Sequence, residues 1–134
     1  MALTSQYHTV GSELIDAIET IQHTITLVIE WNLRRHIQHG QNSALSVDEL
    51  DDLSNIMKHA NMAHVRILAA YHGNRGPFEW DFEACWTLNH VIETSCLEFQ
   101  EVGEWSTKLE AAIVAAEDFA DEEVRRLESD EAPF

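Results

Sequence analysis

Apolar residues in the first third of this chain recur at steps of three and four, and this spacing restricts the fold more than any other feature. The recurring positions are Leu14, Ile18, Ile21, Ile25, Val28 and Ile29. Such spacing places side chains on one face of an α-helix, whereas the alternation typical of a β-strand is confined to residues 25–29. The β-branched residues favour a strand, but a period kept for about four turns outweighs that preference. We therefore predict a helix from about Ser12 to His39.

The second helix has the clearest start signal. Ser46 and Glu49 have the spacing of a capping box, in which each side chain binds an exposed backbone N–H of the other residue, and Leu45 and Leu50 have the spacing of a hydrophobic staple. The apolar seam then continues to Gly73 through Leu50, Leu53, Met57, Ala60, His64, Ile67 and Tyr71. An unbroken series of this kind is typical of a helix in a bundle.

Glycines mark the expected helix ends. Gly40, Gly73 and Gly103 each follow a long amphipathic stretch, and a left-handed glycine is a common helix stop. Pro77 suits the first position of a third helix. The third and fourth helices carry the apolar residues Cys85, Leu88, Ile92, Cys96, Phe99 and Val102, and then Leu109, Ile113, Ala116, Ala120 and Leu127.

This pattern predicts an all-α fold, an up-down bundle of about four long helices. The last two apolar faces are nearly in phase across Gly103, so three helices with one very long C-terminal helix are the alternative. With 134 residues the chain is expected to form a single helical domain over residues 1–134, with residues 1–11 and 128–134 frayed.

Composition narrows the classes of partner. Hydrophobic residues make up 45 % of the chain, which is typical of a folded protein, and the formal net charge is −16. A charge of that sign repels phosphate backbones and anionic lipids, so we expect neither direct nucleic-acid nor membrane binding. The N-terminus has no signal-peptide pattern, and Cys85 and Cys96 are expected to be reduced core residues, so the expected location is the cytoplasm.

The eight histidines do not have the spacing of a metal site. Bundles that bind two iron ions need Glu-x-x-His on two helices, and the sequence contains neither this motif nor His-Glu-x-x-His. His64 lies on the apolar seam, where a hydrogen-bonded core histidine and a phosphotransfer histidine are the two interpretations. The serines and cysteines lack the surroundings of a nucleophile. We therefore predict no cofactor, no metal and no enzymatic activity.

The third segment has more apolar surface than one core needs. Its apolar residues spread over an arc of about 200°, about twice the width of an ordinary core-facing stripe. Phe78, Phe82 and Trp86 stand four residues apart, and Trp80 lies between acidic neighbours. Leu27 and Trp31 form a similar pair on the first helix, away from its seam. The predicted partner-binding residues are Leu27, Trp31, Phe78, Trp80, Phe82 and Trp86.

Three functions fit these observations. The first is a regulatory interaction protein, a homodimer that sequesters or inhibits a protein partner, for example a DNA-binding transcription activator. The second is a nucleic-acid mimic, because eight acidic residues fall between Glu117 and Glu131. The third is a histidine-based metal-binding or phosphotransfer bundle. A further interpretation is that the aromatic residues simply cover the ends of the bundle.

Overall fold

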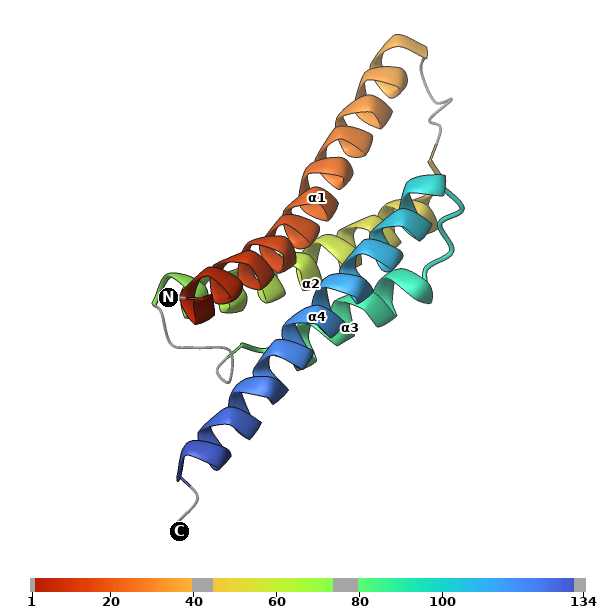
Figure 1. The fold of residues 1–134 in the computed structure, drawn as a ribbon. Coiled ribbons are helices and arrows are strands. Elements are labelled where there is room, and N and C mark those ends of the chain that lie inside the picture. Colours follow the sequence, from red (N-terminus) through yellow and green to blue (C-terminus); the bar gives the residue numbers. More distant parts are fainter. Residues whose placement is uncertain (1, 40–44, 74–79, 132–134) are drawn as a thin grey trace.

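The described part of the chain forms four helices arranged as an up-down bundle, which confirms the predicted all-α fold (Figure 1). The computed structural model describes residues 2–39, 45–73 and 80–131, and these residues include no strand. The helices are α1 (Ala2–His39), α2 (Val47–His72), α3 (Phe82–Glu93) and α4 (Gln100–Glu131). α1 packs against α2 and α4, and α3 closes the ring by packing against both of them. No helix in the described ranges is both long and apolar enough to cross a membrane.

The first helix begins at Ala2 and not near Ser12, so that boundary was predicted wrongly. Tyr7 and Val10 are buried and continue the seam of Leu14 toward the N-terminus at the same steps of three and four. The hydroxyl of Tyr7 donates a hydrogen bond to the carbonyl of Ala70 at 3.4 Å. The early turns of α1 are therefore held against the end of α2.

The start of α2 confirms the predicted capping box. The N–H of Glu49 donates to Ser46 Oγ at 3.1 Å, and the N–H of Ser46 donates to Glu49 Oε1 at 3.0 Å. The helix ends at His72, but Gly73 has a φ of −74° and is therefore not a left-handed stop. The buried stripe also differs from the predicted seam. It consists of Leu53, Ile56, Ala60, Ala63, Ile67 and Ala70, with His64 at its edge.

The third helix is shorter than predicted and ends before Gly103. It begins at Phe82, where the Asp81 side chain accepts the N–H of Ala84 at 2.9 Å, so Pro77 is not its first residue and lies outside the described residues. It ends at Glu93, and the hydroxyls of Thr94 and Ser95 cap the carbonyls of the last turn. Hydroxyl side chains that bind nearby carbonyls favour such an end.

Gly103 lies inside α4, so both predictions for this region were wrong: the break at Gly103 and the alternative of one continuous helix. The link between α3 and α4 is instead anchored to α2, because the N–H of Cys96 donates to Asp52 Oδ2 at 2.7 Å. Cys85 is buried as expected, but Cys96 is exposed, since it belongs to the link and not to a helix face.

Candidate protein-interaction surface

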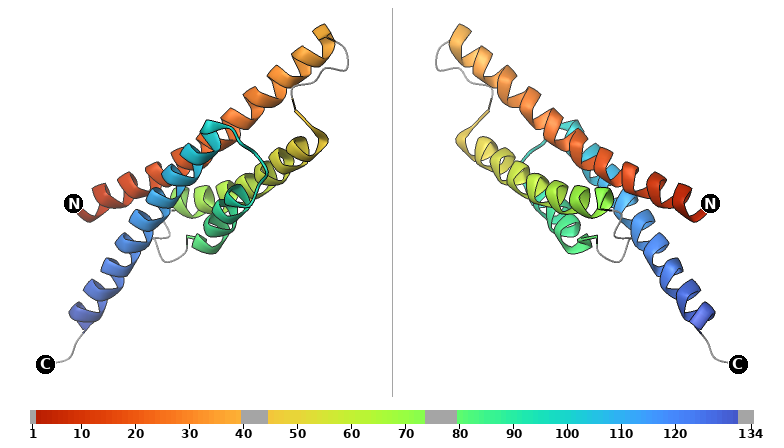
Figure 2. Two further views of the ribbon diagram at one scale, coloured as in Figure 1. Left: turned by 90° about the vertical axis from the view of Figure 1, so that its right-hand side faces the viewer. Right: turned by 90° about the vertical axis from the view of Figure 1, so that its left-hand side faces the viewer.

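The C-terminal half of α1 diverges from the rest of the bundle. In Figures 1 and 2 its orange end points away from the starts of α2 and α4. Nearer the N-terminus, Leu14, Ile18, Ile21 and Ile25 are fully buried along one face. Between residues 26 and 34 the only buried residue is Asn32. The core-forming face of α1 therefore ends about halfway along the helix.

Four large apolar side chains are exposed on this diverging half. The exposed fractions are 50 % for Leu27, 40 % for Ile29, 49 % for Trp31 and 56 % for Leu33. We call these four residues the α1 patch. Ile29 was predicted on the core seam, and that placement was wrong. Large exposed apolar patches are rare on monomers and mark interaction sites.

The α1 patch consists of two stripes that continue the flanks of α1 toward its C-terminus. At about 100° per residue, Leu27 and Trp31 share a flank with Thr20, whereas Ile29 and Leu33 share a flank with Gln22. Thr20 Oγ1 contacts Lys108 of α4, and Gln22 donates to Asn61 of α2 at 2.8 Å. Nearer the N-terminus of α1, these two flanks therefore face the neighbouring helices α4 and α2.

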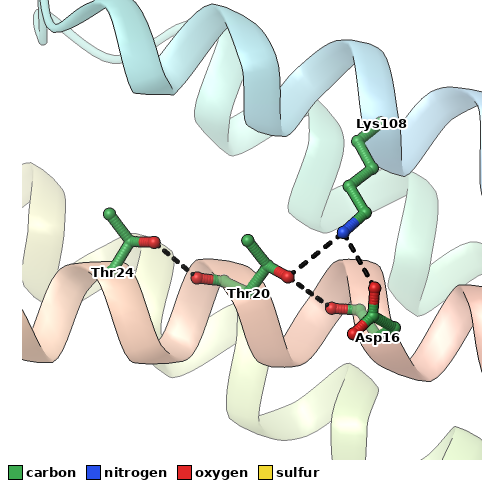
Figure 3. A network of polar contacts seen from close by, with 4 residues as sticks. All are labelled: Asp16, Thr20, Thr24 and Lys108. Atoms are coloured by element: carbon green, nitrogen blue, oxygen red, sulfur yellow. Dashed lines mark hydrogen bonds and ion pairs between the residues drawn. The ribbon is translucent and has the colours of Figure 1, made fainter.

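Polar contacts hold the N-terminal part of α1 beside α4 (Figure 3). Lys108 Nζ lies 2.8 Å from Asp16 Oδ2 and 3.3 Å from Thr20 Oγ1. The hydroxyls of Thr20 and Thr24 each donate to the carbonyl four residues earlier, at 2.8 and 2.7 Å. Such bonds satisfy the threonine hydroxyls within the helix. The exposed ion pair adds little stability, but it marks the register of the two helices.

Asn32 explains why the α1 core ends where it does. It is the buried polar residue on the seam, and its Oδ1 accepts the N–H of Leu45 at 3.2 Å. A buried amide needs such a partner, so this position anchors the entry to α2 and does not extend the apolar core. An asparagine on the seam after Ile25 is the sequence signal that could have revealed the exposed half of α1.

The C-terminal half of α1 also carries little negative charge. Between Glu19 and Asp48 the sequence contains a single carboxylate, Glu30, in a chain with 24 acidic residues. Arg34 is exposed on the same segment, and Arg35 follows it. The α1 patch is therefore apolar and, unlike α4, has few carboxylates near it in the sequence.

The predicted partner-binding residues that the structure describes fall into two groups, one on α1 and one on α3 or just before it. Leu27 and Trp31 belong to the α1 patch, as described above. Phe82 and Trp86 lie on α3 and are half-buried against the core, and the indole N–H of Trp86 donates to Glu117 Oε1 at 3.1 Å. Phe82 and Trp86 thus pack in large part against the bundle itself. Phe78 lies outside the described residues.

Trp80 is not available to a partner, and its prediction was wrong. Its side chain is only 4 % exposed, with ring centroids 5.2 Å from Tyr7 and 6.1 Å from Phe82. Residue 80 precedes the N-cap Asp81, so it does not lie on a helix face. The chain folds it beneath the start of α1, which helical spacing could not predict.

Histidine and cysteine chemistry has little geometric support among the described residues. No group of three or more His, Cys, Asp or Glu side chains there could hold a metal ion. His64 Nε2 lies 3.1 Å from Glu19 Oε2, which accounts for its polarity at the edge of the core. Burial raises the pKa of Cys85 to about 12, and a hydrogen bond with Asp52 contributes most to raising the pKa of Cys96 to about 11. Neither thiol is activated as a nucleophile.

A shallow groove of about 230 Å³ lies between α2 and α3, lined in part by His59, Met62 and Thr87. Its main charged groups, Arg66 and Asp81, are paired with each other. Small-molecule sites are commonly about 300–1,000 Å³ and present convergent polar groups to the ligand. The groove therefore fits a ligand less well than the α1 patch fits a protein surface.

Comparison of the chain with protein-family models, with curated proteins and with solved structures gives no match.

Proposed function

We propose that this protein acts by binding another protein through the α1 patch. The observation that carries the proposal is the exposure of four large apolar side chains on the half of α1 that diverges from the bundle. Helices commonly bind by laying an apolar face into a groove, and tryptophan is enriched among the residues that dominate binding energy. Trp31 is the expected anchor. The more specific role, sequestering a DNA-binding activator, stays a prediction.

The first experiment locates the contact. A photo-crosslinking amino acid is placed at Leu27, on the same flank of α1 as Trp31, or at Val65, an apolar and exposed position on α2. We expect a crosslink to one protein species from position 27 and none from position 65. Equal labelling from both positions would contradict the proposal, since it would indicate non-specific contact.

The second experiment measures affinity with the crosslinked protein after purification. Trp31→Ala should weaken binding at least about tenfold, because buried aromatic anchors contribute about 2 kcal/mol or more. The same substitution should change the free energy of unfolding by less than about 1 kcal/mol, because half of the side chain is exposed. Trp105→Ala, in the core, should cost about 3–5 kcal/mol and serves as the contrast. Unchanged affinity in Trp31→Ala would refute the role of the patch.

A second candidate function is supported by the C-terminal end of α4. This end extends beyond the other helices (Figure 1), and Asp118, Asp121, Glu122 and Glu128 on it are exposed. A projecting helix that carries many carboxylates could occupy a basic groove that normally binds phosphates.

The two candidates predict different variants and salt dependences. Binding through α4 should fall steeply as salt is raised, by analogy with the loss of phosphate contacts. It should weaken in the double variant Asp121→Asn, Glu122→Gln and stay unchanged in Trp31→Ala. Binding that depends on Trp31 but not on these carboxylates would exclude the mimic.

A further inference from the structure

We propose that the Leu27 and Trp31 stripe of the α1 patch also pairs two copies of this chain, with the C-terminal halves of their α1 helices antiparallel about a twofold axis. The pairing uses the same surface as the proposed binding of another protein. Only the predicted competition between that protein and the second copy rests on the proposed function. Charge is the reason for choosing this surface for contact with a second copy of the chain. Two molecules of net charge −16 repel each other, so self-association is least opposed where carboxylates are rare.

The α1 patch combines exposed apolar surface, including Trp31, with low negative charge, since its segment has one carboxylate, Glu30, between Glu19 and Asp48. α2 has no carboxylate after Asp52, but Met62 and Val65 are its only exposed large apolar residues there. On α4, Val124 and Leu127 lie within the acidic C-terminal run, and Val114 stands alone between Glu110 and Glu117. A pairing through α4 would bring two strongly negative helices together, which disfavours that surface.

The register of the pair follows from a self-complementary contact. Twofold symmetry requires that when residue i meets residue j, residue j also meets residue i. If Leu27 of one copy meets Trp31 of the other, antiparallel helices bring Arg34 of the first copy opposite Thr24 of the second. The apolar anchors and the exposed arginine thus lie along one side of the contact.

A carboxylate is placed to receive that arginine. Within one copy Lys108 contacts Thr20, and α1 and α4 run in opposite directions (Figure 1), so Glu104, one turn before Lys108 on α4, is level with the turn of α1 that follows Thr20. Glu104 is exposed. The pairing therefore places Arg34 of each copy near Glu104 of the other, which makes two ion pairs related by symmetry.

Sedimentation of the tag-free full chain tests this arrangement in the absence of any partner. Between about 1 and 200 µM, the range for a small interface, we expect a monomer–dimer equilibrium. Trp31→Ala should weaken it at least about tenfold. At about 0.15 M salt, where long-range repulsion is screened, Arg34→Glu and Glu104→Arg should each weaken it, and the double variant should recover most of the loss because the opposite charges are restored. Val65→Ala is the control and should leave dimerisation unchanged.

Two results would overturn the pairing: a wild-type chain that stays monomeric over the whole range, or a double variant that associates no better than the single variants. Circular dichroism establishes that each variant is folded. If the proposed function also holds, added partner should dissociate the dimer, because both use Trp31. Failure of partner binding alone would leave the sedimentation result intact, so the two proposals can fail separately.

Discussion

Gly11 shows how one residue in α1 allows two helices to approach. A Cβ atom built at this position would lie 2.5 Å from Cδ2 of Tyr71 and 3.3 Å from an indole carbon of Trp80. The Tyr71 ring stacks on Tyr7 at a centroid distance of 5.8 Å. Glycine thus lowers helix propensity by about 1 kcal/mol but permits this aromatic packing.

Replacement of Gly11 and Gly103 by alanine should have opposite effects. Gly11→Ala should lower the free energy of unfolding by about 1–3 kcal/mol, because the tyrosine ring must move out of its packed position. Gly103→Ala should raise it by about 0.5–1 kcal/mol, since nothing lies within 4 Å of the added Cβ. Urea denaturation of both variants checks the prediction. Stabilisation by both would show that the ring moves at no cost.

At the scale of the helix, the stability of α3 depends strongly on the residues at its ends. It has 12 residues, and isolated helices of this length are marginal in water. Its stability therefore comes from the packing of residues such as Leu88 and Ile92, which are buried, and from the cap at Asp81. Hydrogen bonds from the Ala84 N–H and then from Arg66 lower the pKa of Asp81 below its ordinary value of 3.8.

The Asp81 cap should make stability depend on pH in a defined direction. A lowered pKa means that the carboxylate stabilises the fold above pH about 4 and that this contribution is lost as the pH falls further. Asp81→Ala should cost about 1 kcal/mol at pH 7. The difference from wild type should shrink below pH about 4, as measured by urea denaturation from pH 7 to pH 2. Asp81→Asn keeps a capping oxygen and should lose less at pH 7. A difference that is constant with pH would contradict the assignment.

At the scale of the whole molecule, net charge opposes every contact between copies. The proposed pair brings together two molecules of charge −16, and its two exposed ion pairs contribute only about 0–1 kcal/mol each. The long-range repulsion therefore exceeds the local attraction when salt is low. Apolar contact through Leu27 and Trp31 must supply most of the association energy.

Self-association should consequently strengthen as salt is raised. The screening length falls from about 30 Å at 0.01 M to about 8 Å at 0.15 M, which shortens the range of the repulsion between copies. We expect the dimer dissociation constant from sedimentation to decrease over this range. The opposite trend would indicate that ion pairs, and not the apolar patch, dominate the contact.

Local rules within the sequence determined the helical fold and some of the helix ends. The capping box of Ser46 and Glu49 needs only neighbouring residues, and the seam from Leu14 to Ile25 needs only the helical period, so both were predictable. The exposure of Leu27 and Trp31 was also expected from their position away from the seam. These features depend on contacts over a few residues.

Only the tertiary structure decided which apolar residues are covered. Trp80 is buried because the start of α1 lies over it, and Ile29 is exposed because α1 diverges from its neighbours beyond Ile25. The link at Cys96 is likewise anchored by Asp52, a residue 44 positions away. Burial depends on elements far apart in sequence, whereas helical periodicity reports only which side of one helix is apolar.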